Sequence, residues 1–398
     1  MKDLKIFADI IEDEAIEQID TLMAQHAFKD AKVRIMPDVH AGKGCVIGFT
    51  ADLGNKIIPN IVGVDIGCGM YVQELGRIDI DFQKLDRAIK QNIPSGLKVR
   101  NSTFVPFPLR TLRCFENLKN VDRLEKSMGT LGGGNHFIEI DENKNGTKFL
   151  IIHTGSRNLG LQVAKYYQDL AIKECNDHTR KVNEKQAQLI MEYRRLGKEQ
   201  EIEQAIKDLK TEYYATAFNV PKELCYLEGE NAEDYLHDMK ICQAWASLNR
   251  KAIAEILTSK MGWKNDAHSR FEVIHNYIDE DNMVRKGAIS AKVNQPILIP
   301  LNMRDGCIFG FGKGNPDWNY SAPHGAGRLL SRAAAKATLS LEDYKNEMSN
   351  IYTTSVNNAT LDEAPMAYKP TETITNMIGD TVRILDIWKP IYNFKANE

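Results

Sequence analysis

The 398-residue sequence contains no apolar run approaching the ~20 residues that a membrane-spanning helix requires. Its first residues, MKDLKIFADIIEDEAIEQID, carry acidic side chains where a signal peptide needs a basic start and an uninterrupted apolar segment. The seven cysteines are odd in number and irregularly spaced, which argues against a disulfide framework and indicates a reducing compartment. We therefore expect a cytoplasmic protein that does not enter a membrane.

The sequence also lacks an excess of positive charge, since 51 lysines and arginines face 54 aspartates and glutamates, for a formal net charge of −3. Any binding of nucleic acid would depend on local basic clusters, because the field of the whole molecule would not attract phosphate. Internal repeats and low-complexity tracts are also missing. A hydrophobic content of 43% and a charged content of 26% are typical of a globular enzyme and exclude a disordered chain.

Glycines gather in four stretches of the chain, at residues 42–69, 129–134, 306–314 and 325–327. Because glycine permits positive φ and close backbone approach, these stretches predict tight loops near ligands or neighbouring backbone. Short β-branched runs alternate with them and predict buried strands. The runs are NKIIPNIVGVDI, HFIEI, KFLIIH, FEVIHNY and QPILIP.

The stretch from about 160 to 265 has a different character. It is rich in Ala, Leu, Lys, Glu and Gln with apolar residues at helical spacing, which predicts long helices with a break at Pro221. The expected fold is therefore α+β: a single core spanning residues 1–398, built of mixed β-sheets flanked by helices, with a helical insertion at about 160–265.

Side chains that bind metal ions lie next to these predicted strands. Asp65 and Cys68 stand three residues apart in the glycine turn DIGCG, so both can face one point. His136 precedes a predicted strand, whereas His153 and His275 follow apolar runs. Imidazole and thiolate suit transition metals, and ligands in stiff turns or at strand ends are held in place. These five residues are the candidate metal ligands.

Each candidate also has an ordinary structural alternative. A single buried cysteine usually behaves as a small hydrophobic residue, and a single histidine in a strand is usually a hydrogen-bonded core residue. The five form a metal site only if they converge in space, and the chain has no CxxC or HExxH pattern that would require this. Ligand chemistry alone favours zinc over manganese.

A second group of residues surrounds His324 in the segment SAPHGAGR (321–328). The following residues, LLSRAAAKATLSLED, predict a helix with Arg328 and Arg332 on its first turns. A helix N-terminus and guanidinium groups both attract phosphate, and a neutral imidazole can attack phosphorus to form a phosphoramidate. The alternative is a turn in which His324 only caps the helix.

Basic residues recur within the same glycine motifs: Lys43 in HAGKG, Arg157 in HTGSR, Lys286 in RKGA and Arg328 in HGAGR. Together they would form a local anion site in a slightly acidic protein. Considered alone, each of these residues would be expected to lie on the solvated surface without a binding role.

Seven motifs occur in one order along the chain: DVHAGKG (38–44), GVDIGCGM (63–70), GTLGGGNHFIEI (129–140), HTGSRNLG (153–160), RKGAISA (285–291), HGAGRLLSR (324–332) and PMAYK (365–369). As an ordered set they resemble the RtcB family of tRNA-splicing and RNA-repair ligases. The resemblance extends from about residue 38 to the last few residues. It implies an RtcB-type catalytic domain.

The resemblance implies a GTP-dependent RNA ligase that joins 3′-phosphate or 2′,3′-cyclic phosphate ends to 5′-hydroxyl ends. His324 would attack the α-phosphorus of GTP, expel pyrophosphate and pass its guanylate to the RNA 3′-phosphate before the 5′-hydroxyl attacks and GMP leaves. Two manganese ions, for which zinc or another divalent metal can substitute, would be held by Cys68 as a bridge and by Asp65, His136, His153 and His275. RNA is the implied partner, and we expect a monomer.

The same resemblance implies a nucleotide pocket in which Asn135 holds a phosphate, Phe137 and Tyr368 enclose guanine, and Glu139 and Lys395 read its edge. Further nucleotide contacts would come from Ala326 and Gly327. Contacts to phosphate or RNA would come from Asp38, His40, Lys43, Arg157, Lys286 and Arg328.

One segment departs from the family pattern. Many members carry Pro-Gly-Ser-Met-Gly where this chain has PLNMRDG (300–306), so we expect a reshaped pocket wall and a divergent branch of the family. No nucleotide role is transferred to Leu301 or Asn302, and the helical insertion is a second place for specialised substrate contacts. The alternatives are a dinuclear-metal phosphoesterase in which His324 only binds phosphate, and a catalytically impaired RNA-binding protein.

Overall fold

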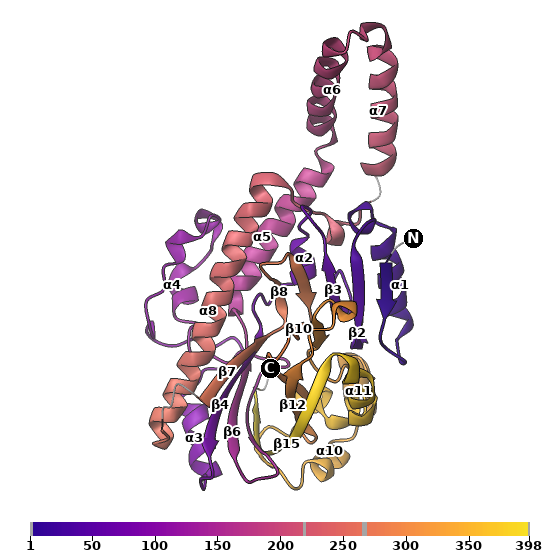
Figure 1. Cartoon of the computed structure of the whole chain (residues 1–398). Helices are drawn as coiled ribbons and strands as arrows, with labels where there is room; N and C mark the ends of the chain where they lie inside the picture. Colours follow the sequence, from indigo (N-terminus) through magenta and orange to yellow (C-terminus); the bar gives the residue numbers. More distant parts are fainter. Residues whose placement is uncertain (1–2, 218–219, 265–268, 397–398) are drawn as a thin grey trace.

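The computed structural model describes residues 3–217, 220–264 and 269–396, and Figure 1 shows how sheets and helices are arranged in this part of the chain. The largest sheet contains β4 (Gly69–Gly76), β5 (Phe137–Glu142), β6 (Lys148–Thr154), β7 (Arg270–Ile274), β11 (Pro296–Asn302), β12 (Gly306–Gly312), β14 (Tyr352–Thr353) and β15 (Val382–Lys395). Its strand order is β11-β12-β15-β5-β6-β4-β7, and β14 pairs with β15.

A second sheet contains β1 (Asp3–Ile6), β2 (Lys32–His40), β3 (Ile47–Asp52), β8 (Asn276–Ile278) and β9 (Met283–Lys286), in the order β1-β2-β3-β9-β8. A short antiparallel pair joins β10 (Ala288–Ser290) to β13 (Ser321–Pro323). His275 alone separates β7 of the first sheet from β8 of the second. The two large sheets therefore meet at a candidate metal ligand.

The described α-helices are α1 (Asp13–Ala24), α2 (Pro59–Val62), α3 (Phe82–Asn92), α4 (Val121–Glu125), α5 (Arg157–Asn176), α6 (His178–Arg195), α7 (Ile202–Ala217), α8 (Gly229–Met261), α9 (Arg332–Thr338), α10 (Leu341–Glu347) and α11 (Thr371–Met377). Helices α5 and α8 lie side by side against the sheets, whereas α6 and α7 form a hairpin that projects away from them (Figure 1). No described helix is both long and apolar enough to cross a bilayer.

The long helix α8 is buried along much of its length because large apolar side chains face the core. Trp245 and Tyr235 of α8 are fully buried, and the ring of Tyr235 meets Tyr167 of α5 at a centroid distance of 5.3 Å. Burial of apolar surface on this scale is the main favourable contribution to folding. It fixes α8 as the support on which the loops of the site rest.

The structure confirms the α+β fold class and most of the strand predictions. HFIEI, KFLIIH and QPILIP lie in β5, β6 and β11, and FEVIHNY is divided between β7 and β8. The predicted helices occupy α5 to α8, with Pro221 in the break before α8. The strand prediction for NKIIPNIVGVDI is wrong, because that run forms the short helix α2. Pro59 suits a first helical position and Gly63, at φ 91°, ends the turn.

Candidate active site

The Cys68 thiol lies at the centre of a group of buried imidazole and carboxylate side chains. Its Sγ is 3.5 Å from Nε2 of His136 and 3.4 Å from Nε2 of His153, and the Asp65 carboxylate lies 3.0 Å from Nε2 of His136. Two overlapping groups result, Asp65–Cys68–His136 and Cys68–His153–His275, each with its ligand atoms within 4.8 Å of one another. All five candidate ligands therefore converge, and Cys68 belongs to both groups.

Strand register places these ligands together. His153 pairs with Met70 of β4 and with Phe137 of β5, while the backbone N–H of His275 donates to the Cys68 carbonyl at 3.0 Å. The turn before β4 requires glycine at position 67, where φ is 68° and a Cβ atom would lie 2.9 Å from the α8 backbone. The glycine turn thus carries Cys68 against α8 and beside three strands.

The electrostatics of this group suit a metal ion. Burial lowers the pKa values of His153 and His275 well below the usual range, so both rings are neutral at pH 7. Their Nδ1 atoms are buried and have no hydrogen-bond partner among the described residues. Burial also raises the pKa of the Cys68 thiol, and a thiol in such a place becomes a thiolate when a cation binds it. The donor set therefore fits transition-metal ions.

Helix α8 holds the loops that carry the ligands. The Asn249 side chain accepts from the backbone N–H groups of Gly129 and Thr130, at 2.8 and 3.1 Å, and donates to the Gly155 carbonyl at 3.2 Å. The neighbouring Arg250 is fully buried and donates to the carbonyls of Gly67 and Thr154. Sequence analysis did not identify these two residues, because nothing in a helical pattern distinguishes a buried Asn-Arg pair from a solvated one.

A cavity opens beside this centre and shares His153 with it. All seven residues expected to contact a nucleotide line the cavity, together with His324 and two of the expected phosphate contacts, His40 and Arg328. The seven are Asn135, Phe137, Glu139, Ala326, Gly327, Tyr368 and Lys395. Residues from three distant regions of the chain thus surround one space.

His324 follows β13 and enters the cavity from a loop. Its Nδ1 lies 2.7 Å from Oδ2 of Asp38, and its ring centroid lies 4.8 Å from that of His275. The predicted helix is present but starts later than expected, because α9 begins at Arg332 with Ser331 as its cap, so Arg332 but not Arg328 lies on its first turn. The loop passes so close to β2 that a Cβ atom at Gly327 would lie 2.5 Å from the Asp38 carbonyl oxygen. Arg328 is therefore a loop residue, and His324 caps no helix.

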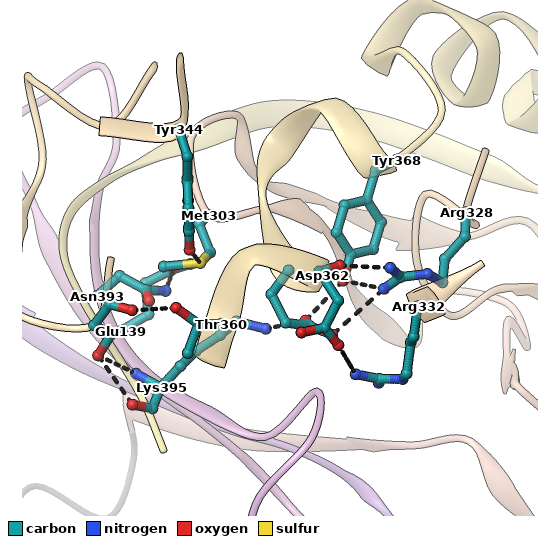
Figure 2. Close-up of polar contacts among 12 residues, drawn as sticks. Glu139, Met303, Arg328, Arg332, Tyr344, Thr360, Asp362, Tyr368, Asn393 and Lys395 are labelled. Atoms are coloured by element: carbon teal, nitrogen blue, oxygen red, sulfur yellow. Dashed lines mark hydrogen bonds and ion pairs between the residues drawn. The ribbon is translucent and has the colours of Figure 1, made fainter. Parts of the chain in front are cut away.

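Glu363, at the end of the 3-10 helix η8 (Asn358–Glu363), is a buried carboxylate that forms ion pairs with the basic residues lining the cavity. It accepts from the Tyr368 hydroxyl at 2.8 Å and from Arg332 at 2.8 Å, and it pairs with Lys395. Although burial opposes ionisation, Lys395 and Arg332 lower the pKa of Glu363 to about 2. Figure 2 shows Arg328, Arg332 and Tyr368 directed toward this end of η8. No sequence motif marked Glu363.

Four of the expected phosphate or RNA contacts do not line this cavity, and these are Asp38, Lys43, Arg157 and Lys286. Lys286 is buried and donates to the backbone carbonyls of Lys43 and Asn60, at 2.8 and 3.1 Å, while Lys43 itself is exposed. Arg157 donates to the Gly96 carbonyl and lines a second cavity together with Asp65 and His136. Candidate metal ligands therefore line both cavities, His153 the first and Asp65 and His136 the second.

The divergent segment forms the turn between β11 and β12. Pro300, Leu301, Asn302 and Met303 line the first cavity, whereas Arg304 and Asp305 do not. The added charges pair with each other, at 2.8 Å, and Arg304 also pairs with Glu347. The departure therefore changes the shape of the cavity wall without adding a charge to its lining.

An α+β fold with a convergent thiol–imidazole centre whose residues line two cavities is the arrangement of a candidate metalloenzyme. The family model described as tRNA-splicing ligase RtcB matches residues 19–113 and 112–396, and the chain belongs to this RtcB family. It is 30% identical to the RNA-splicing ligase RtcB of Escherichia coli K12 and 29% identical to RtcB1 of E. coli ATCC 25922, in each case over 94% of this chain and 92% of the relative. The tRNA-splicing ligase RtcB of Aeropyrum pernix is 27% identical over 86% of this chain and 83% of its own length.

Proposed function

We propose that this protein is a GTP- and Mn²⁺-dependent RNA ligase that joins 3′-phosphate or 2′,3′-cyclic phosphate ends to 5′-hydroxyl ends. The observation that carries the proposal is the position of His324. It lines the same cavity as the seven expected nucleotide contacts, and its ring lies 4.8 Å from that of His275 in the candidate metal centre. A nucleotide in the cavity would present its phosphates to both His324 and the metal site.

The first step is transfer of guanylate to His324. Because Asp38 accepts the Nδ1 proton, Nε2 keeps its lone pair and attacks the α-phosphorus of GTP. A nitrogen–phosphorus bond forms, the bond to the β-phosphate bridging oxygen breaks, and pyrophosphate leaves. Guanylate then stays on the ring as a phosphoramidate.

The metal ligands would be Asp65, Cys68, His136, His153 and His275. When bound, two divalent cations supply neutralisation of the negative charge that accumulates as phosphoryl oxygens approach one another. The protein supplies neutral imidazoles, because burial keeps the pKa values of His153 and His275 low.

Recognition of guanine would come from the inner end of the cavity. Phe137 and Tyr368 offer aromatic faces, and the buried carboxylate of Glu139 can accept from the ring N–H and the amino group of guanine. Adenine presents an acceptor where guanine has the ring N–H. The pattern therefore favours GTP over ATP.

The RNA end would enter from the second cavity, which is lined by Arg123 and Arg157 beside Asp65 and His136. An oxygen of the RNA 3′-phosphate attacks the guanylate phosphorus and releases His324, which leaves a 3′-pp-5′-G end. The 5′-hydroxyl then attacks the RNA phosphorus, its proton is lost, and GMP leaves. A 2′,3′-cyclic phosphate is first opened by water.

The test is a ligation assay with RNAs of defined ends, in the presence of GTP and Mn²⁺. A joined product from 3′-phosphate and 5′-hydroxyl ends, absent with 3′-hydroxyl and 5′-phosphate ends, is expected. Release of inorganic phosphate or an opened end without joining would instead indicate a dinuclear phosphoesterase. Binding of RNA with neither reaction would indicate a catalytically impaired protein.

A further inference from the structure

Three buried polar side chains lie together at the inner end of the nucleotide cavity. Glu139 and Asp141 stand two residues apart in β5 and so project from the same face of the sheet. Cys307 belongs to the strand β12. One polar atom of each lies within 4.8 Å of the others. Glu139 lines the cavity, whereas Asp141 does not, and Asp141 is fully buried behind it.

The surroundings of this cluster provide little compensation for two negative charges. No described N–H or O–H group donates a hydrogen bond to either carboxylate oxygen of Asp141, and no described cation forms an ion pair with it. The nearest lysines are committed elsewhere, since Lys395 pairs with Glu363 and Lys389 donates to the Asp305 carbonyl. Glu139 itself accepts from Asn393, and Figure 2 shows these two side chains together with Lys395.

Two buried carboxylates in contact do not both ionise at low cost, and the usual solution is to share one proton. Burial raises the pKa of Asp141 well above its ordinary range, and the charge of Glu139 raises it further. Burial also raises the pKa of Glu139, against hydrogen bonds from Asp141 and Asn393 that lower it. The proton therefore resides on Asp141, while Glu139 carries the charge.

We propose that Asp141 is a neutral carboxylic acid at pH 7 that donates its proton to Glu139 and thereby keeps Glu139 ionised to bind guanine. The inference rests on the proposed function, in which Glu139 reads the guanine edge. Asp141 is accordingly a positioning residue, because it acts on the nucleotide only through Glu139. Guanine would contact Glu139, and both Asp141 and the Cys307 thiol, whose Sγ lies 4.0 Å from Oε1 of Glu139, lie beside that carboxylate.

The direction of the pH effect follows from the contact between Glu139 and Asp141. Guanine donates two N–H groups, so it needs an ionised acceptor, and its binding weakens as pH falls through the raised pKa of Glu139. Removing the donor at Asp141 raises that pKa further and moves the weakening to higher pH. Lys395, Lys389 and Cys307 also face the pair, and they remain unchanged in every variant.

The test compares Asp141→Asn, which keeps a hydrogen-bond donor without charge, with Asp141→Leu, which has a similar volume and no donor. The probe is GMP, which cannot guanylylate His324, with IMP as the analogue that lacks the amino group. Binding is measured calorimetrically from pH 5.5 to pH 8 on the full chain. The Asn variant should bind GMP with an affinity within about threefold of that of the unmodified protein. Its affinity should decrease over the same acidic pH range.

The Leu variant should bind GMP about tenfold more weakly at pH 7 and prefer GMP over IMP by a smaller factor. The decrease of its GMP affinity with falling pH should begin at a higher pH. A loss that is equal at every pH would show a structural role and overturn the proposal. Tighter binding in the Asn variant would show that Asp141 is normally ionised and would also overturn it. A metal ion lost together with the Asp141 carboxylate would show a cation site instead.

A second measurement does not depend on how the Leu variant folds. Infrared spectra of the unmodified protein should contain the carbonyl band of a protonated, buried carboxylic acid, and Asp141→Asn should remove it. Absence of that band at pH 7 contradicts the proposal. If the unmodified protein fails to bind GMP at all, the proposed function itself fails, which is a distinct result.

Discussion

Oδ2 of Asp38 accepts three hydrogen bonds from one short segment: from Nδ1 of His324 at 2.7 Å, from the His324 backbone N–H at 3.0 Å and from the Gly325 backbone N–H at 3.1 Å. Asp38 is fully buried in β2. Because an ionised carboxylate only accepts, Nδ1 carries the ring proton and Nε2 is free. This single contact fixes the ring orientation and the tautomer that the proposed chemistry requires.

Asp38→Asn should slow the guanylylation of His324 by about 10²- to 10⁴-fold, because the amide can donate to Nδ1 and so favours the wrong tautomer. The measurement is the rate of covalent guanylate incorporation, with the melting temperature as a check on folding. Asp9→Asn, at an exposed position, is the matched control and should leave the rate unchanged. An unchanged rate of guanylate incorporation in the Asp38 variant would show that Asp38 does not orient the His324 ring.

The two overlapping ligand groups make a prediction about metal stoichiometry. Cys68→Ala should lose high-affinity binding of both ions, because Cys68 belongs to both groups, whereas His275→Ala should lose one. Calorimetric titration with Mn²⁺ and elemental analysis would count the ions. Cys45→Ala removes another buried thiol that belongs to neither group and should keep both. Loss of only one ion in Cys68→Ala would argue against a shared thiolate.

Glu363 should stabilise the fold in a pH-dependent way. Its pKa is about 2 in the folded protein, and an unfolded glutamate titrates near 4.3, so its contribution is present above that value and is lost as pH falls toward 2. The difference corresponds to about 3 kcal/mol at pH 7. Denaturant unfolding of Glu363→Gln should show a large destabilisation at pH 7 that shrinks by pH 3.

Glu372→Gln, at an exposed site, is the control for this comparison and should change stability by no more than about 0.5 kcal/mol at either pH. Equal destabilisation of Glu363→Gln at pH 7 and pH 3 would mean that its ionisation does not contribute.

The divergent turn gives a matched pair of variants. The Asn302 side chain accepts from the backbone N–H groups of Arg304 and Asp305, at 3.0 and 2.9 Å, so Asn302→Ala should loosen the cavity wall and raise the KM for GTP by about tenfold. Arg304 does not line the cavity, so Arg304→Ala should change the KM by less than about twofold. Similar effects of the two substitutions on guanylylation kinetics would contradict this account of the turn.

The parts of the structure that sequence could predict are those with local signals. Alternating or continuous β-branched runs identified β5, β6 and β11, and ordered motifs brought attention to Cys68 and His324. Hydrophobicity alone cannot distinguish strand from helix in a short apolar run such as the one that contains Pro59. In that run, proline at the start and glycine at the end favour the helix α2.

Residues that act through tertiary contacts escaped sequence analysis. Glu363 has a role only because Lys395 and Arg332 approach it from distant segments, and Asn249 and Arg250 become supports only when α8 packs against the loops. Asp141 likewise gains importance from burial beside Glu139. Such pairings depend on long-range packing, which spacing along one chain does not encode.

The central claim is that His324 carries guanylate, and one measurement tests it directly. The protein is incubated with Mn²⁺ and GTP labelled at the α-phosphate, then denatured and assayed for a covalent, acid-labile label. The account predicts a labelled protein that is absent in His324→Ala, present in His26→Ala at an exposed site, and absent when the label is on the γ-phosphate. Failure to form an adduct with Mn²⁺ or any other divalent metal, or an adduct that persists in His324→Ala, would contradict it.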